Sequence, residues 1–421
     1  MAMKSKMENM ERKLAEHYKK VAQVEALYTI LADKIPKDDS SYLFIGRNGG
    51  EFTGNVKYLY LHFIKNIPHI KSCFLTHRRE VYSELTEAGL PVILFPSEQE
   101  KLIASCGTVI VDSISFRTKL YYPLVAQAKQ VQLWHGVGNK KIGFQLQGAS
   151  CLKGRDQTLM EDHSGYDIVV STSPFYTDEV FRKSMDAKQF VSLGYPRTDI
   201  FFQKPDKNTL IGCDTTVYAK VKRAGTKGPV ILFTPTFRDN GVNPLTQDIL
   251  QLEMLVAFLK EKNAHLVVKT HTRTPVKFGS LPDNLIVCDA ASDIYPLMPL
   301  TDIMITDYSS IFTDYLLLDK PVIFFWSDYD KYMGMDRGFQ FPLEPMCPGP
   351  KCKTVNELFQ GIAEALQGKD DWKAARRAMR DKSFSHTQGG ACDRIADYLL
   401  RGNTQKQKHD EKNRRPSLKK K

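Results

Sequence analysis

Residues 303–310 combine an apolar segment with side chains that can bind an anion. Ile303–Thr306 has the composition of a buried β-strand, and it leads directly into Asp307, Ser309 and Ser310. The first backbone amides of a helix lack internal partners and carry partial positive charge, so a helix that begins here favours a bound phosphate. The alternative is an ordinary helix cap, in which Asp307 or a serine satisfies these amides and no ligand binds.

Polar residues follow three other apolar segments in the same way. His135, Arg238 and His271 each come shortly after a short β-rich segment. Parallel α/β sheets bind ligands outside the carboxyl ends of their strands, so these side chains are expected to converge with the serines. The spacing therefore predicts one site, in which imidazole, guanidinium and hydroxyl groups surround a phosphate.

The elements that must position these residues alternate along the chain. Short β-rich segments are separated by helical stretches, and this rhythm predicts mostly parallel sheets with helices on both faces. A polar segment around 203–227 interrupts it, which predicts two doubly wound domains facing each other across a cleft. The predicted strands are 42–45, 73–75, 92–95, 108–111, 130–134, 168–171 and 190–193, then 230–233, 266–269, 285–288, 303–306 and 322–326.

The predicted domains follow from this division. Residues 1–40 are expected to form a basic amphipathic helix, with Leu14, Val21, Val24, Leu27 and Leu31 on its apolar side. Residues 41–210 form a first Rossmann-like domain, and residues 225–400 form a second one that includes C-terminal helices. Residues 401–421 are expected to be a disordered basic tail.

Composition excludes several classes of protein. The chain has 421 residues, of which 42% are hydrophobic, so it can bury substantial cores. It contains no apolar run long enough to span a membrane, and its N-terminus lacks the apolar segment of a signal peptide, so a location on the cytosolic side is expected. The eight cysteines include no C-x-x-C pair and are expected to be reduced thiols that bind no metal.

The net charge of +11 lies mostly at the two ends of the chain. Residues 401–421 carry nine Lys or Arg against two acids, and residues 1–20 carry six against three. The body is therefore nearly neutral, which argues against a dedicated nucleic-acid binder. The basic ends could meet an anionic membrane surface, or they could be solubilising tails.

Several segments together resemble one family. They are Phe44–Tyr60, which contains Asn55-Val56-Lys57-Tyr58, and Trp134–Gly136, Thr234–Arg238, Lys269–His271 and Ile305–Tyr315. In order and spacing they are similar to the CDP-glycerol glycerophosphotransferase family, the enzymes of wall teichoic acid and related capsule synthesis. The resemblance extends from about residue 41 to residue 400.

The resemblance implies a GT-B fold and a division of labour between the two domains. The first domain is expected to hold the acceptor, a lipid-linked or glycan molecule, and the second to hold a CDP-activated polyol donor. By position, His135 matches the family's proposed general base. The donor-binding residues implied in this way are Arg238, His271, Asp307, Ser309 and Ser310. Asp314, one helical turn beyond Ser310, is added to them, and the expected acceptor-binding residues are Arg47, Asn48 and Lys57.

Each role has a structural alternative. His135 could donate to a carbonyl and orient its loop, and the same holds for His271. Asp314 could bind ribose hydroxyls or merely favour the N-terminal half of its helix. Lys269 is expected to pack its stem rather than to touch phosphate. Asp307 could bind a metal, but no second acid stands at ligand spacing, so neither a metal site nor a cofactor is expected.

The function predicted from the sequence is transfer of glycerol phosphate, or a related polyol phosphate, from CDP-glycerol to an acceptor hydroxyl, with release of CMP. The chain is expected to be a cytoplasmic, peripheral enzyme on the inner face of the plasma membrane. Two alternatives remain: a GT-B glycosyltransferase that uses a nucleotide sugar, and a non-catalytic assembly module on a membrane surface.

Overall fold

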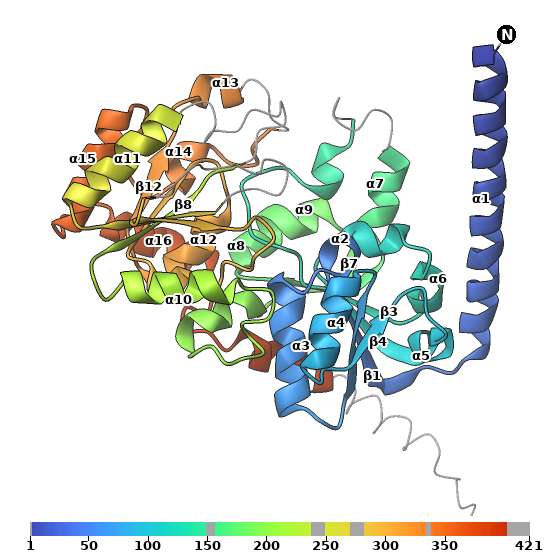
Figure 1. The fold of residues 1–421 in the computed structure, drawn as a ribbon. Coiled ribbons are helices and arrows are strands. Elements are labelled where there is room, and N and C mark those ends of the chain that lie inside the picture. Colours follow the sequence, from blue (N-terminus) through green and yellow to red (C-terminus); the bar gives the residue numbers. More distant parts are fainter. Residues whose placement is uncertain (1, 149–155, 237–248, 270–281, 334–337, 402–421) are drawn as a thin grey trace, which may run out of the picture.

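The computed structural model describes residues 2–148, 156–236, 249–269, 282–333 and 338–401. Two lobes lie side by side, each built on one parallel sheet with helices around it (Figure 1). Arg238 and His271 fall outside the described residues.

The sheet of the first lobe has seven parallel strands in the order β3-β2-β1-β4-β5-β6-β7. The second half of β1 and most of β4, at the centre of the sheet, consist of buried apolar residues, as expected for strands covered on both faces. The direction of strand addition reverses between β1 and β4, which makes this the topological switch point of the sheet. The strands are β1 (Asp38–Ile45), β2 (Lys71–Thr76), β3 (Val92–Leu94), β4 (Cys106–Val111), β5 (Lys129–Gln132), β6 (Tyr166–Ser171) and β7 (Ala187–Ser192).

The sheet of the second lobe repeats this plan with six parallel strands in the order β10-β9-β8-β11-β12-β13. Its switch point lies between β8 and β11, which pair from Ile303 with Ile231 to Thr306 with Thr234. The strands are β8 (Val230–Thr234), β9 (His265–Lys269), β10 (Leu285–Cys288), β11 (Ile303–Thr306), β12 (Val322–Phe325) and β13 (Lys351–Cys352).

Every strand predicted from the sequence is present among the described residues, and the two doubly wound sheets confirm the predicted fold class. The strand missed was β13, a two-residue edge strand that is too short to leave a pattern in the sequence.

The helices surround the two sheets. In the first lobe and the connection they are α1 (Ala2–Lys34), α2 (Arg47–Gly50), α3 (Gly54–Asn66), α4 (Arg79–Glu87), α5 (Glu100–Ser105), α6 (Tyr122–Val125), α7 (Asp156–Asp162), α8 (Pro174–Tyr176), α9 (Arg182–Ser184) and α10 (Thr215–Ala224). In the second they are α11 (Ile249–Glu261), α12 (Ile311–Tyr315), α13 (Tyr329–Met333), α14 (Leu343–Met346), α15 (Val355–Leu366) and α16 (Lys373–Ser383). Short helical turns include Ile114–Thr118, Gly143–Leu146, Thr177–Phe181, Pro196–Phe202, Met298–Leu300 and Leu316–Leu318.

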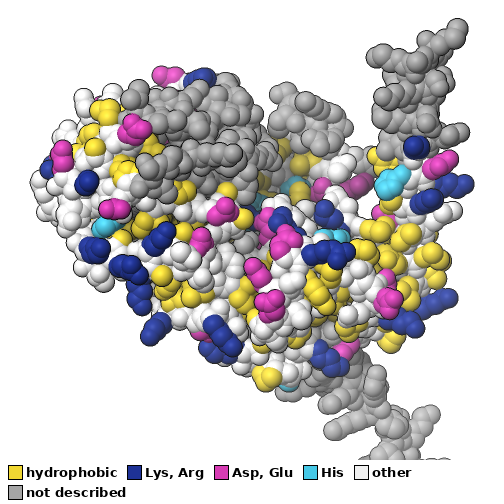
Figure 2. Space-filling view, viewed as in Figure 1, with side chains coloured by type: hydrophobic (Ala, Val, Ile, Leu, Met, Phe, Trp, Pro, Cys, Tyr) yellow, Lys and Arg dark blue, Asp and Glu magenta, His cyan; other side chains and the backbone are white. Residues whose placement is uncertain are grey.

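Helix α1 lies within the N-terminal segment for which a helix was expected, and it stands largely clear of the body (Figure 1). Its C-terminal part contacts the first lobe, where the rings of Tyr28 and Phe95 lie 6.2 Å apart. Leu27, which lies on the predicted apolar side of this helix, is 63% exposed. Figure 2 shows hydrophobic side chains on the surface where α1 meets the first lobe.

The two lobes are joined by a continuous buried core, which includes residues of both sheets. The last helical segment, residues 391–401, lies against the first lobe, although it follows the second lobe in the sequence. Its first amides, those of Ala391 and Cys392, donate to the Asp199 carboxylate at 2.9 and 2.8 Å.

Candidate active site

A cleft of about 570 Å³ lies between the lobes, and its walls are the carboxyl ends of strands from both sheets. Both switch points open into it, which is where doubly wound sheets bind ligands. The first lobe contributes Arg47, Asn48, Glu51, Thr53, Gly54, Asp112, His135 and Arg197. The second lobe and its loops contribute Thr234, Pro235, Lys269, Ser309, Ser310 and Ile311, with residues 290–295.

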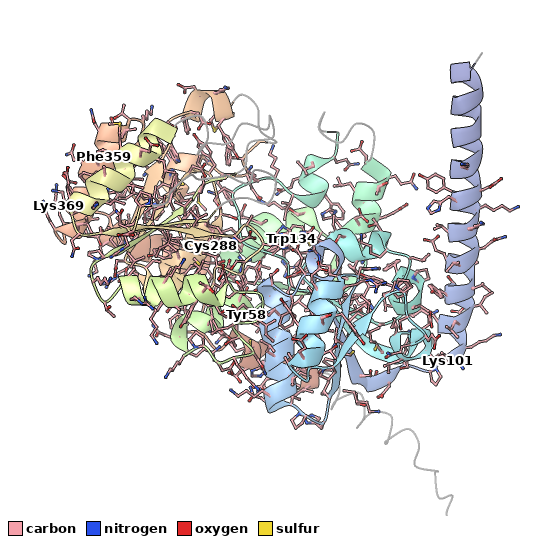
Figure 3. All side chains as sticks on the ribbon, viewed as in Figure 1. Tyr58, Lys101, Trp134, Cys288, Phe359 and Lys369 are labelled. Atoms are coloured by element: carbon pink, nitrogen blue, oxygen red, sulfur yellow. The ribbon has the colours of Figure 1, made fainter. Side chains whose placement is uncertain are left out.

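His135 enters the cleft because the chain turns sharply after β5. Trp134 has a φ of 55°, a left-handed conformation that is uncommon for a large residue. Two hydrogen bonds hold it there: its N–H donates to the Gln132 side chain at 2.9 Å, and its carbonyl accepts from Asn55 at 2.8 Å. Such strained backbone persists only where its surroundings fix it, and it often marks a functional site. Trp134 lies on the side of the first lobe that faces the second (Figure 3).

The protonation of His135 follows from its contacts. Its Nδ1 lies 3.1 Å from the Asp112 carbonyl, which can only accept, so Nδ1 carries the proton of the neutral ring. Nε2 then has a free lone pair. Solvent reaches one side of the imidazole through the cleft. The protein packed around the rest of the ring disfavours its charged form, and with the charges of Arg47 and Arg197 this lowers its pKa to about 4. His135 is therefore neutral at pH 7, in the form that accepts a proton.

Arg197 connects the histidine to the second lobe. Its guanidinium donates to the His135 carbonyl and to Asp314 Oδ2, both at 2.5 Å. Tyr295 donates its hydroxyl to the same carboxylate oxygen at 2.6 Å. Burial alone would lower the pKa of Arg197, but the Asp314 carboxylate outweighs burial and raises it. Arg197 therefore stays charged while it bridges the two lobes.

The second lobe presents Ser309 and Ser310 to the cleft where β11 leads into α12. The two lobes approach each other closely here, since a Cβ on Gly138 would lie 3.4 Å from Ser310 Cβ. Lys269 also lines the cleft, but its amino group donates to the carbonyls of Ala290 and Ser292, both at 2.7 Å. It therefore anchors the loop that forms one wall, and its burial lowers its pKa.

The structure separates the predicted residues into two groups. His135, Ser309 and Ser310 line one cleft with Arg47 and Asn48, as the rule for strand ends predicted. Three of the predicted residues, Lys57, Asp307 and Asp314, have their side chains in internal contacts outside the cleft lining.

Lys57 was predicted to bind the acceptor, but it is fully buried under the interface between the lobes. Its amino group lies 2.8 Å from Asp293 Oδ2 and donates to two backbone carbonyls. Tyr58, next in the sequence, donates to the same carboxylate at 2.8 Å. This position corrects the prediction, because a lysine with its amino group filled by internal acceptors cannot reach an acceptor molecule.

Asp307 and Asp314 were predicted to bind the donor. Asp307 accepts from the backbone and side chain of Thr236 and so fixes the segment after β8. Asp314 is fully buried and accepts from Arg197 and Tyr295, so its carboxylate holds the lobes together instead of facing a ribose. Both act on the cleft indirectly, by placing the segments that form it.

Asp112 and Arg197 were missed at the sequence level. Asp112 follows directly after the predicted strand 108–111, and Arg197 lies four residues after the predicted strand 190–193. The same rule for strand ends could have found both. Within the part of the chain that the structure describes, no group of three or more His, Cys, Asp or Glu side chains could hold a metal ion.

The family model for CDP-glycerol:poly(glycerophosphate) glycerophosphotransferases matches residues 27–401, which include both lobes and the whole cleft. The chain belongs to this family. It is therefore a transferase, and the family's reaction is the transfer of glycerol phosphate from CDP-glycerol. The family resemblance predicted from the sequence is confirmed.

Relatives in this glycerophosphotransferase family support the assignment. A teichoic acid ribitol-phosphate primase of Bacillus spizizenii is 28% identical over 70% of this chain and 75% of its own length. A teichoic acid glycerol-phosphate transferase of Staphylococcus aureus is 22% identical over 94% of this chain and its full length. The chain spans only 45% of a teichoic acid poly(glycerol phosphate) polymerase of Bacillus subtilis, at 25% identity.

The solved structure of a variant of the wall teichoic acid polymerase TagF has the same fold. It superimposes with a TM-score of 0.74 at 20% identity, over 94% of this chain and 99% of that one. The predicted GT-B architecture is thereby confirmed. Among the described residues, no helix is both long and apolar enough to cross a bilayer.

Proposed function

We propose that this chain transfers glycerol phosphate, or a related polyol phosphate, from a CDP-linked donor to a hydroxyl of a teichoic-acid-like acceptor. The donor lies against Ser309 and Ser310 of the second lobe, with Arg238 and His271 as further donor-binding residues, and the acceptor lies against Arg47 and Asn48 of the first. The acceptor oxygen forms a bond to the distal phosphorus as the bond to CMP breaks.

His135 carries the proton transfer in this proposal. The observation that supports it is the hydrogen bond from Nδ1 to the Asp112 carbonyl, which leaves the Nε2 lone pair free in a cleft shared with Ser309 and Ser310. Nε2 takes the proton of the attacking hydroxyl as the new bond forms. The negative charge of a bound pyrophosphate raises the pKa of the imidazole above its value in the free enzyme, which makes it a stronger base when substrate is present.

Phosphoryl transfer of this kind requires mainly alignment and cancellation of charge. The backbone amides at Ser309 and Ser310 and the guanidinium of Arg47 supply positive potential on opposite walls of the cleft. The division between the walls agrees with a donor on one lobe and an acceptor on the other.

The test is the release of CMP from CDP-glycerol in the presence of an acceptor with a glycerol phosphate end. His135→Ala should lower this rate about 10²- to 10⁴-fold, as expected for loss of a general base. His265→Ala is a matched control, because His265 begins β9 at the opposite end of the strand from the cleft, and its turnover should match the wild type. A wild type that leaves CDP-glycerol intact but releases a nucleoside diphosphate from a nucleotide sugar would instead identify a glycosyltransferase. Unchanged turnover in His135→Ala would exclude this histidine as the base.

We also propose that the basic ends hold the enzyme at the cytoplasmic face of the plasma membrane, close to a lipid-linked acceptor. Helix α1 projects from the body with exposed apolar side chains, including Leu27 and Ile30, and residues 401–421 carry seven net positive charges, nine basic residues against two acidic ones. Each Lys or Arg near an anionic surface contributes about 1 kcal/mol of attraction.

Sedimentation with vesicles separates this proposal from that of solubilising tails. The full chain should bind vesicles that contain phosphatidylserine, bind less as salt rises, and bind vesicles of pure phosphatidylcholine weakly. Deletion of residues 401–421 should reduce binding and leave the turnover of a soluble acceptor unchanged. Equal binding to both kinds of vesicle at all salt concentrations would contradict the electrostatic mechanism.

A further inference from the structure

Asp112 is a buried carboxylate whose oxygens make no hydrogen bond of standard geometry within the protein. It follows β4 at the switch point of the first sheet and lines the cleft, and its side chain is fully buried. Neither Oδ1 nor Oδ2 makes a hydrogen bond of standard geometry, although the charge of Arg47 and a weak contact with the Val56 amide lower the pKa. Burial outweighs that effect and raises the pKa of Asp112 to about 6.

Other buried carboxylates of the described residues are bonded. Asp199 accepts from two backbone amides, and Asp293 accepts from Lys57 and Tyr58. A carboxylate that is buried without such partners destabilises the folded protein. Residues that cost stability in this way are typical of functional sites, where a ligand supplies the missing bonds.

A glycine lies next to this carboxylate, where a side chain would collide with it. Gly54 begins α3 with a φ of 67°, and a Cβ at this position would lie only 2.8 Å from Asp112 Oδ2. The Arg47 guanidinium lies close enough to influence both Asp112 and His135, because its charge lowers the pKa of each. The main-chain carbonyl of Asp112 meanwhile orients the His135 ring. Asp112 thus orients the His135 ring through its main-chain carbonyl, while its carboxylate can still accept hydrogen bonds.

We propose that the Asp112 carboxylate binds a non-reacting hydroxyl of the acceptor's terminal polyol, beside the hydroxyl that His135 deprotonates. This inference rests on the function proposed above and specifies how the acceptor is recognised. A polyol end offers two hydroxyls on adjacent carbons, so one can be held while its neighbour attacks.

The ligand's chemistry follows from charge and position. A carboxylate accepts hydrogen bonds and repels phosphate, so its partner is a neutral donor such as a hydroxyl group. Asp112 belongs to the first lobe, across the cleft from Ser309 and Ser310, so the acceptor rather than the donor is the polyol within reach. Arg47 offsets the carboxylate's charge from the same wall.

The experiment compares wild type with Asp112→Asn, which keeps the shape and removes the charge. Turnover is measured with an oligo(glycerol phosphate) acceptor and with an analogue that ends in propane-1,3-diol phosphate and so lacks the secondary hydroxyl. For the natural end, Asp112→Asn should lower kcat/KM of the acceptor about 10- to 100-fold, the usual effect of losing a hydrogen bond to a charged group. The analogue should be equally poor for both proteins, because the hydroxyl and the carboxylate act as one pair.

Measurements of stability and donor binding separate acceptor binding by Asp112 from a purely structural role of this residue. The Tm of Asp112→Asn should equal or exceed that of the wild type, and its Kd for CDP-glycerol by calorimetry should be unchanged. Asp199→Asn is the matched control: its carboxylate is buried but fully bonded, so this variant should lose Tm and keep the wild-type KM for the acceptor.

Three results would overturn the inference. They are a fall in Tm in Asp112→Asn with unchanged acceptor kinetics, a selective loss of CDP-glycerol binding, and continued preference of Asp112→Asn for the natural end over the analogue. A wild-type protein that releases no CMP from CDP-glycerol with any acceptor would instead refute the proposed function, and this outcome is seen before any variant is compared.

Discussion

The ion pair between Arg197 and Asp314 makes a prediction about stability that can be stated with a magnitude. The two side chains are 8% and 1% exposed, and Arg197 Nη2 lies 2.5 Å from Asp314 Oδ2. Asp314→Asn leaves the guanidinium buried without its counter-charge. Breaking a buried pair in this way costs about 3–5 kcal/mol. That is a large share of the roughly 5–15 kcal/mol by which a typical protein is stable.

The same variant should impair catalysis through His135. Arg197 also donates to the His135 carbonyl, so a guanidinium that moves in search of new partners displaces the imidazole. A displacement of about 1 Å at a reacting group can cost about 100-fold in rate. We therefore expect kcat to fall by about that factor, with little change in the KM for CDP-glycerol because Asp314 lies outside the cleft.

Urea unfolding and CMP release measure the two effects. Asp178→Asn is the control, since Asp178 pairs with Arg182 on the surface and such pairs contribute about 0–1 kcal/mol. An Asp314→Asn variant as stable as Asp178→Asn would refute the account of the buried pair. A stable variant with a raised KM for CDP-glycerol would restore the earlier expectation that Asp314 binds the donor's ribose.

Two further predictions concern Lys57 and the pH dependence. Lys57→Met leaves Asp293 buried without its cation, so the free energy of unfolding should fall by about 3–5 kcal/mol. The fraction of the protein that stays folded should keep its KM for the acceptor. A raised KM in a variant of full stability would contradict this prediction. Because the pKa of His135 is lowered to about 4 and the neutral ring is the proposed base, kcat/KM should hold as pH falls from 7 and decline only near pH 4. Arg47→Met removes a positive charge near His135, so it should move this fall in kcat/KM to higher pH. If kcat/KM of the wild type fell near pH 6.5, the ordinary pKa of histidine, the lowered pKa of His135 would be contradicted.

The sequence was sufficient to predict the fold because parallel sheets leave a strong local pattern. Each buried strand is a short run of apolar residues, and the rule for strand ends then placed His135, Ser309 and Ser310 in one cleft. This rule depends only on the order and direction of the strands, so it can be applied to a sequence without a structure. Applied to every strand, it also indicates Asp112, which was missed because it was not applied to that strand.

Side chains that join the lobes could not be predicted in this way. Lys57 and Asp293 are 236 residues apart, and Arg197 and Asp314 are 117 apart, so no local pattern connects the partners. A lysine beside the cleft was therefore assigned to a substrate when it serves the interface. Helical periodicity likewise predicts the apolar side of α1 but not whether anything covers it, and Leu27 on that side is exposed.

The segment Asn55-Val56-Lys57-Tyr58 makes internal contacts that position the cleft. Asn55 holds the Trp134 carbonyl, and through its Oδ1 it also accepts from the Arg197 amide at 3.2 Å. Lys57 and Tyr58 hold Asp293, which belongs to the opposite wall. One helix therefore fixes the turn that presents His135 and the distance to the second lobe together. A proton acceptor on one lobe can serve a phosphate on the other only if that distance is fixed, so these residues act on catalysis through the geometry of the cleft.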